Sequence, residues 1–563
     1  MRRFSYFAVV LLLVIGLAAT VQAEEDRYGG QIIIGSIADA SLLNPIVEAD
    51  SASYDINYWV FDSLIRLDET LTPQPVLAEN WEISDDGTQI VFNLKEGVLF
   101  HDGVEFTAAD VEFTVFSILD YRSNTLKRPY FDSLLGAREY LNRISELDSQ
   151  YGDEEISSEE HAELADAAFE DLKAAGGVEI VDDYTIVFNL ATPFAPFLTV
   201  ALDLGIAPKH LLEGEDVNTT AFNANPVGTG PFQFVEWRRS DRVVLEAFED
   251  YHEGRPYLDR VIYRVIPDQT VLVTEVRSGG VDYMQQPPPE MIPRLESDPN
   301  LNVMQIDTVA YTYMGFQLTN PLFQDVKVRQ AISYAIDNEA IVEFILLGYG
   351  QEATGPFPEA MWAYNPDVRR FSYNPDRAIE LMAEAGWTLN SDGKMEKDGE
   401  VFAFSLETNQ GNELREQMVV IVQEQLSQIG IDVTVSLSEW PTFVDRLLAA
   451  NYEAVVVGWT GTADPDGYGY TVWHSSQFPG RNTSQYANDR VDYLLEQARI
   501  EMDIDKRAEY YFEFQEILAE EQPYVFGYFA DQIHVANARY QGWVPTPQRE
   551  GILLSLKNVW IED

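Results

Sequence analysis

Residues 401–466 read VFAFSLETNQGNELREQMVVIVQEQLSQIGIDVTVSLSEWPTFVDRLLAANYEAVVVGWTGTADPD, and the pattern of this stretch decides the fold class. Three short apolar segments with strand character alternate with two segments whose apolar side chains recur at the spacing of one helix face. A β-α-β-α-β order of this kind predicts an α/β fold, with a parallel sheet, helices on its faces and right-handed crossovers. The strands are expected at 401–408, 431–437 and 452–459, and the helices at 414–426 and from Pro441 onward.

The last of these strands ends in a loop that is the first candidate for a binding site. Its valine-rich run 454–457 is typical of a central strand that is buried on both faces. Sheets of this kind bind ligands beyond the carboxyl ends of their strands. Here that end is the segment 458–461, with the sequence GWTG, followed by the segment 464–466, with the sequence DPD.

Aromatic residues make up 12% of the chain, and several of them gather around this loop. Most aromatic side chains pack in cores, and each one taken alone has that alternative role. A group of Trp and Tyr beside Gly and Asp at a strand end has the composition of a pocket, in which rings stack on the ligand and a few polar groups fix its position. We therefore expect ligand contacts from Trp440, Trp459, Thr460 and Tyr468.

Length and composition limit what the chain can be. With 563 residues it is too long for one compact core and suits two or three domains. Its 93 acidic and 37 basic residues give a formal net charge of −56, which excludes nucleic acid and anionic membrane surfaces as partners because their phosphates would be repelled. It has no cysteine, so its cores must be stable without disulfides, and no lipid-anchoring cysteine can follow a leader.

The N-terminal residues have the pattern of a secretory signal peptide. Arg2 and Arg3 precede the apolar run 7–19, and Val21-Gln22-Ala23 has the small residues of a cleavage site. The alternative is an uncleaved membrane anchor, but the run is short for a bilayer span of about 20 residues. We expect residues 1–23 to be removed by cleavage after Ala23, which leaves a free periplasmic protein.

Nothing in the sequence indicates catalysis or a cofactor. The six histidines are scattered, and local zinc-ligand spacing, phosphate-binding loops, dinucleotide fingerprints and the Gly-x-Ser-x-Gly motif do not occur. We therefore predict that the chain binds no metal or cofactor and is not an enzyme. The alternative from another class is an exported glycoside hydrolase or peptidase, with Asp464 and Asp466 as a carboxylate pair. Acidic residues are so common in this chain that two of them at this spacing are weak evidence.

A β-rich region surrounds the most acidic part of the chain. Residues 90–94 and 184–190 alternate as short strands. Between them, the charged stretch 145–173 has the Ala and Leu spacing of a solvated helix on a domain surface.

The chain also carries an ordered series of short motifs, and their order and spacing resemble one family. It is similar to the extracellular solute-binding proteins of the oligopeptide/dipeptide-binding type, family 5, which serve ATP-driven importers. The resemblance covers nearly all of the mature chain. Its glycines at 228 and 230 favour turns that fix the fold. The motifs are 75–81 (PVLAENW), 85–87 (DDG), 100–103 (FHDG), 225–232 (NPVGTGPF), 254–256 (GRP), 280–282 (GVD), 328–331 (VRQA), 335–337 (AID), 385–387 (AGW) and 473–476 (WHSS).

The resemblance implies a two-lobed fold of the type II-like periplasmic-binding-protein kind. The lobes are joined by a hinge and enclose the ligand, and an extra β-rich subdomain extends the first lobe. Lobe I is then expected at 24–75, 206–305 and 536–563, its subdomain at 76–205, and lobe II at 306–535.

The resemblance also implies a function and further site residues. The protein would be a monomeric periplasmic receptor that captures peptides between its lobes and delivers them to the permease subunits of an ABC transporter. In peptide-binding relatives an aspartate in the loop after the Gly-Trp strand holds the α-amino group, which points to Asp464, or second to Asp466, although Asp-Pro-Asp is also turn chemistry. Tyr54 and Tyr313 fall in segments expected to line the cleft, with core packing as the alternative. Other open functions are a receptor for oligosaccharides or another solute, and a sensory or chaperone-like protein of the same fold.

Overall fold

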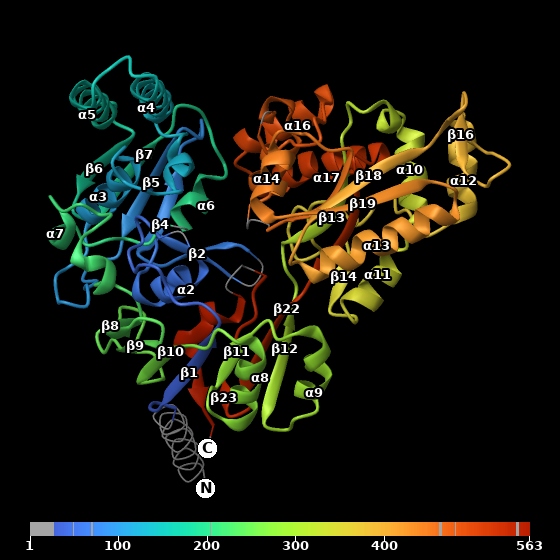
Figure 1. Ribbon diagram of the computed structural model, residues 1–563. Coiled ribbons are helices and arrows are strands. Elements are labelled where there is room, and N and C mark those ends of the chain that lie inside the picture. Colours follow the sequence, from blue (N-terminus) through green and yellow to red (C-terminus); the bar gives the residue numbers. More distant parts are fainter. Residues whose placement is uncertain are drawn as a thin grey trace, which may run out of the picture.

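The protein is described by a computed structural model for residues 27–562, apart from residues 49, 69–70, 203, 461–463, 479 and 548–550. The signal peptide expected at 1–23, and its cleavage after Ala23, lie outside the described residues. In the part of the chain that is described, no helix is long and apolar enough to cross a membrane. Figure 1 shows a mixed α/β molecule with two lobes, which confirms the predicted fold class.

Lobe I is built on a seven-stranded sheet with the order β12-β22-β11-β1-β10-β9-β8. Strand β1 runs parallel to β10 and β11, and the other neighbours are antiparallel. The strands are β1 (Gln31–Ser36), β8 (Phe232–Arg238), β9 (Arg242–Ala247), β10 (Arg260–Val265), β11 (Tyr283–Gln285), β12 (Leu301–Ile306) and β22 (Gln532–Asn537).

Helices cover the lobe I sheet, and one of them approaches the C-terminal segment. Helices α8 (Gln269–Ser278) and α9 (Ile292–Glu296) pack on β11, β12 and β22. Helix α2 (Ser51–Val60) lies beside η6 (Gly551–Asn558), where the indole nitrogen of Trp59 donates to the carbonyl of Leu553 at 3.1 Å. Short elements complete the lobe: β2 (Ile65–Leu67), β3 (Pro73–Pro75), α7 (Lys209–Leu212), η2 (Ala221–Ala224), η3 (Pro289–Met291), β23 (Tyr540–Gln541) and β24 (Trp560–Ile561).

The subdomain of lobe I is an antiparallel sheet with the order β4-β5-β7-β6 and several helices. The two strands expected here are confirmed as β5 and β7. The single helix expected over 145–173 is instead two helices, because Ser157 caps a second one by accepting from the amide of Glu160. The elements are β4 (Ala78–Ile83), β5 (Gln89–Leu94), β6 (Val178–Asp182), β7 (Thr185–Asn189), α3 (Ala108–Leu119), η1 (Arg128–Phe131), α4 (Ala137–Gly152), α5 (Ser158–Ala174) and α6 (Phe197–Leu202).

Lobe II contains the predicted β-α-β-α-β unit, in which β18 runs parallel to β19 and β20. The valine-rich strand β20 lies between β18 and β13, and residues 454–457 are at most 3% exposed, as expected of a central strand. The whole sheet, β14-β21-β13-β20-β18-β19, is mixed because β13 is antiparallel to β20 and β21. Its strands are β13 (Tyr311–Phe316), β14 (Gly350–Glu352), β18 (Ala403–Asn409), β19 (Asp432–Ser438), β20 (Ala454–Trp459) and β21 (Tyr524–Ala530).

The helices of lobe II begin and end where local chemistry places them. Asn374 caps α12 by accepting from the amide of Arg377, Pro375 occupies the first helical position, and Gly386 follows the helix with a φ of 90°. The helices are η4 (Pro321–Phe323), α10 (Val326–Ala335), α11 (Asn338–Ile345), α12 (Pro375–Glu384), α13 (Glu413–Gln428), α14 (Trp440–Leu448), α15 (Asp466–Trp473), η5 (Ser475–Gln477), α16 (Asp489–Ile500) and α17 (Ile504–Glu521), and β15 (Thr388–Leu389), β16 (Met395–Lys397) and β17 (Glu400–Val401) form a small sheet.

The chain crosses between the lobes at two neighbouring places. One crossing joins β12 to β13, and the other joins β21 to β22 across Asp531, whose carboxylate accepts from Gln305 at 2.5 Å. The second crossing was expected after residue 535, but β22 already belongs to the lobe I sheet. The other domain boundaries stay predictions.

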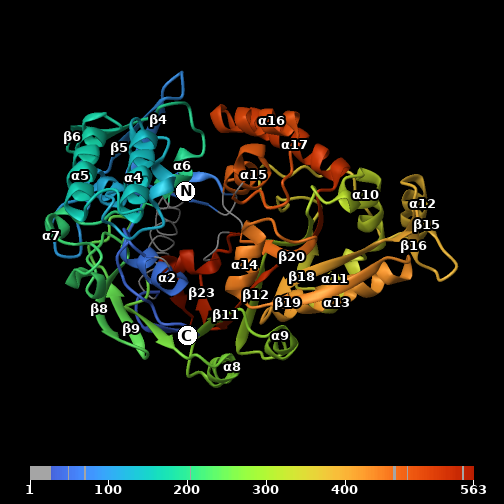
Figure 2. The same ribbon diagram turned by 45° about the horizontal axis from the view of Figure 1, so that its top comes forward.

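The lobes also touch away from these crossings. Leu71, between β2 and β3, packs in an apolar cluster of lobe II. The amide of Ala195 donates to the carbonyl of Arg499 at 2.8 Å, and the Arg499 guanidinium lies 4.9 Å from the ring centre of Phe194. Figure 2 shows the subdomain near α16 on one side and the crossing strands on the other.

Candidate ligand-binding site

The carboxyl edge of the lobe II sheet carries the aromatic group that the sequence indicated. Trp459, the last residue of β20, is half-buried, and its ring centre is 5.5 Å from that of Tyr468 on α15. The hydroxyl of Tyr468 lies 2.8 Å from that of Thr460, which is exposed. Trp440, at the start of α14, is 50% exposed. Trp459, Thr460 and Tyr468 therefore lie together at the end of β20, and Trp440 begins the helix that follows the carboxyl end of β19 at the same edge of the sheet.

Tyr313 belongs to the core. Its side chain is 0% exposed, and its ring stacks on Tyr524 with 3.8 Å between ring centres. The strand that carries it, β13, is covered on both sides by neighbouring strands and on its faces by packed side chains. The structure therefore favours the core-packing alternative for Tyr313, and its contact with a ligand stays a prediction.

Asp464 has a strong partner within the protein. Both of its carboxylate oxygens accept from Arg507 on α17, at 2.8 Å and 2.7 Å, and the two side chains are only 13% and 6% exposed. Burial disfavours the charged form of Arg507, but the negative charge of Asp464 outweighs it and raises the pKa of the guanidinium above its ordinary value. Asp464 thus anchors its loop to α17, a role that the sequence did not reveal.

Asp466 is the more buried of the two aspartates. It is 5% exposed, and one carboxylate oxygen lies 3.1 Å from Nε of Arg499. Its amide donates to the Asp464 carboxylate at 2.8 Å, which starts α15. Burial raises its pKa to about 6, against the lowering effect of Arg499 and with a further rise from the charge of Asp464.

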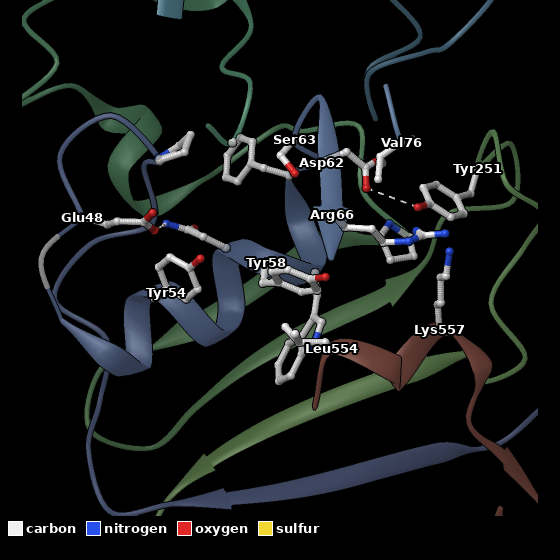
Figure 3. Close-up of a pocket in the computed structure, with 16 residues that line it drawn as sticks. Glu48, Tyr54, Tyr58, Asp62, Ser63, Arg66, Val76, Tyr251, Leu554 and Lys557 are labelled. Atoms are coloured by element: carbon white, nitrogen blue, oxygen red, sulfur yellow. Dashed lines mark hydrogen bonds between the residues drawn. The ribbon is translucent and has the colours of Figure 1, made fainter. Parts of the chain in front are cut away.

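Lobe I contributes a separate pocket beneath α2, drawn in Figure 3. Tyr54, which the family resemblance placed in the cleft wall, lines this pocket and is partly buried. The other lining residues are Pro45, Glu48, Asn57, Tyr58, Trp59, Phe61, Asp62, Ser63, Arg66, Val76, Gly205, Pro231, Tyr251, Leu554 and Lys557.

Comparison with known proteins identifies the family of this two-lobed chain. The model for the middle region of the bacterial extracellular solute-binding proteins, family 5, matches residues 72–480. The chain belongs to this family. It is 35% identical to the oligopeptide-binding protein AppA of Bacillus subtilis over 97% of this chain and 94% of that protein. It is 27% identical to a dipeptide-binding protein of Escherichia coli, over 95% of each chain. The structure of AppA with a nonapeptide covers 95% of this chain and all of that one, with a TM-score of 0.70 at 32% identity.

This solute-binding protein has one further candidate contact that sequence reasoning missed. Arg415, at the start of α13, is partly buried, donates to Asn409 at 2.9 Å, and lies 6.0 Å from the ring centre of Trp440. Among the described residues no carboxylate forms an ion pair with it, and burial lowers its pKa. A cation without an ionic partner among the described residues, at the carboxyl edge of such a sheet, is a candidate ligand contact. Helix periodicity alone does not distinguish it from a surface arginine.

In the part of the solute-binding protein that the structure describes, no three His, Cys, Asp or Glu side chains are grouped as metal ligands would be.

The pKa of Asp466 predicts how the stability of the solute-binding protein varies with pH. Because the folded pKa is raised from 3.8 to about 6, protonated Asp466 stabilises the fold fully below pH 3.8, and this contribution is lost as the pH rises through about 6. The Asp466→Asn variant cannot ionise there. We expect its melting temperature to rise relative to wild type between about pH 4 and pH 7. Calorimetry of both proteins across this range measures the difference, and a difference that is constant with pH contradicts the assignment.

Proposed function

We propose that this protein is the exported receptor of an ABC importer, which captures peptides between its lobes and delivers them to the membrane permease. Export would follow cleavage after Ala23. Two relatives named for peptide binding, one of them solved with a nonapeptide, support the ligand class. We also infer that the protein acts as a monomer, and that it binds its ligand without transforming it, as the family name indicates.

The observation that carries the proposal is the composition of the carboxyl edge of lobe II. Trp440 and Thr460 are exposed there, and Trp459 is half-buried. Among the described residues the guanidinium of Arg415 donates only to Asn409, which leaves further N–H groups for a ligand. Helix α14, which carries Trp440, lies at the side of lobe II nearest to lobe I in both views (Figures 1 and 2). Rings that stack and donors that bind carbonyl oxygens are the groups needed to hold an extended peptide.

Capture would work by movement of the lobes about the two crossings. A ligand that touches both lobes stabilises the arrangement in which they are close, since only there can it make all its contacts. Asp464 and Asp466 contribute by fixing the loop next to Trp459, through Arg507 and Arg499. Because each carboxylate faces its own arginine, the pair is an unsuitable catalytic acid and nucleophile for a hydrolase.

A ligand screen tests the peptide assignment. We expect di- to pentapeptides to raise the melting temperature of the mature protein, because a ligand that binds only the folded state adds about 2.7 kcal/mol of stability at one hundred times its Kd. Cello- and xylo-oligosaccharides should have no effect. A rise in melting temperature with sugars alone is consistent with a receptor but overturns the peptide assignment. Chemical turnover of either ligand overturns the receptor role.

Two variants localise the binding that the screen detects. Trp440→Ala removes a ring that is 50% exposed, so the fold should survive while peptide affinity falls about fivefold or more. Tyr493→Ala removes a ring of α16 that is 46% exposed and serves as the control, with no expected change. If the two variants change peptide affinity equally, the carboxyl edge of lobe II is not part of the binding site.

A further inference from the structure

We propose that the lobe I pocket under α2 is an anion subsite that takes a carboxylate group of the ligand. This role rests on the proposed function, because it requires a ligand that lies between the lobes. It assigns to lobe I a polar contact that complements the aromatic edge of lobe II.

The pocket borders the place where the lobes meet. Arg66 lies on β2, and five residues later Leu71 packs in the apolar cluster of lobe II. In Figure 1 α2 and β2 lie on the side of lobe I that faces lobe II, and Figure 2 shows α2 on the same side. A ligand held at the carboxyl edge of lobe II is therefore within reach of this wall.

Three cations converge on a single carboxylate at the pocket. Arg66 donates twice to Glu253, at 2.7 Å and 3.2 Å, Lys557 contacts the same carboxylate, and Lys95 lies 3.6 Å from it. Burial disfavours the charge of Glu253, but Arg66 and Lys557 outweigh it and lower its pKa to about 2. The cluster thus keeps an excess of positive charge inside a chain whose net charge is −56.

The other acids of the pocket are matched by partners of their own. Asp62 accepts from Tyr251 at 3.2 Å and lies 2.9 Å from Nε2 of His252. Glu48 accepts from Lys127 at 2.7 Å and from Asn57. Neither of these acids forms an ion pair with Arg66 or Lys557 among the described residues, although the charge of Asp62 favours the charged form of Lys557. Three cations beside Glu253 and Asp62 still leave an excess of positive charge on the Arg66 side of the pocket.

Arg66 and Lys557 have donors to spare for a second carboxylate. A guanidinium has five N–H donors and an ammonium has three. Arg66 uses two of them on Glu253 and Lys557 uses one. Figure 3 shows their nitrogen atoms side by side at one end of the pocket, next to the ring of Tyr251. Planar paired donors match a carboxylate, and such charge-assisted bonds are stronger than neutral ones.

The negative electrostatic field of the whole protein increases the importance of a positively charged subsite. A net charge of −56 repels acidic ligands, so a ligand carboxylate gains most where the local potential is reversed. The carboxylate can come from the C-terminus of a peptide or from an acidic side chain, and both present the same group to the pocket.

Paired ligands and charge variants test the subsite by calorimetric titration. The first pair compares a peptide that has a free C-terminal carboxylate with the same peptide amidated at its C-terminus. The second pair compares two C-terminally amidated peptides that differ only in having Glu or Gln at one position. Arg66→Gln and Lys557→Gln are expected to weaken the carboxylate member of the responsive pair about tenfold, and to leave its uncharged partner unchanged. The pair that responds identifies the source of the carboxylate.

The controls separate this role from a structural one. Lys95→Gln removes a cation that contacts Glu253 without lining the pocket, and it should leave the preference for the carboxylate intact. Arg66→Lys keeps the charge and should retain part of the preference. Equal weakening of both members of a pair, or a wild type with no preference in either pair, overturns the subsite while peptide binding stands. A wild type that binds no peptide overturns the proposed function and the subsite together.

Discussion

Arg507→Ala is expected to lower the free energy of unfolding by about 3–5 kcal/mol, because it removes one partner of a buried ion pair. Asp464 would keep its charge in a site that is 13% exposed, beside the buried Asp466. The variant also loses the bond from Arg507 to the carbonyl of Ala498, at 2.7 Å, which joins α17 to α16. Urea unfolding of wild type and variant measures the loss.

An exposed ion pair between α16 and α17 is the matched control. Arg490 on α16 forms a bidentate pair with Glu513 on α17, at 2.7 Å and 2.6 Å, but its side chains are 49% and 42% exposed. Arg490→Ala should therefore change stability by no more than about 1 kcal/mol. The double variant Asp464→Met/Arg507→Met should be more stable than Arg507→Ala, since no charge is left buried. Equal losses for Arg490→Ala and Arg507→Ala contradict the importance of burial.

The same ion pair bears on how a peptide amino group is held. A carboxylate whose two oxygens accept from an arginine is largely neutralised, and it is a weaker anchor for an ammonium than a free carboxylate would be. Comparison of a peptide with its N-acetylated form on Asp464→Ala decides whether Asp464 also contacts the ligand. A loss confined to the free amine would assign the amino group to Asp464.

Gly228→Ala is expected to destabilise the protein by about 3 kcal/mol or more, at the upper end of the range for overpacking. A Cβ atom at this position would lie 2.0 Å from the carbonyl oxygen of Val60 and 2.8 Å from the ring of Phe61. The amide of Gly230 donates to the same carbonyl at 2.9 Å, so backbone and not a flexible side chain must move. Thermal and urea unfolding measure the effect.

Gly152→Ala is the control for this substitution. Gly152 lies at the end of α4, and a Cβ there meets nothing within 4 Å, so alanine should be neutral or slightly stabilising. The turn around Gly228 also holds His101, through bonds of 2.9 Å and 3.2 Å. Gly228→Ala should therefore also disturb the end of α2 and the lobe I pocket. Similar melting temperatures for the two variants would contradict the close approach.

The sequence determines the lobe II unit well because its signals are local. Each signal comes from residues within a single element. These signals are the apolar residues at steps of four on α13, the Asn-Pro start of α12 and the valine run of β20. The break between α4 and α5 was missed because a capping Ser157 inside an acidic helical pattern is a weak signal.

The site was less predictable because its decisive contacts are remote in sequence. Asp464 and Arg507 are 43 residues apart, and no motif announces their pairing. Tyr313 lies on a strand that is buried on both faces, so alternation gave no sign of which residues reach the ligand. The pocket cations Arg66 and Lys557 come from opposite ends of the chain and meet only through the fold around Glu253.

The position of β22 has a consequence for how the protein reaches its destination. This strand, near the C-terminus, lies between β12 and β11 inside the lobe I sheet, and β11 joins it to the N-terminal strand β1. During synthesis, therefore, lobe I cannot close its sheet until residue 537 has left the ribosome. If the protein is exported as proposed, a chain whose lobe I sheet is completed only by β22 can still pass unfolded through a secretion channel until translation is nearly complete.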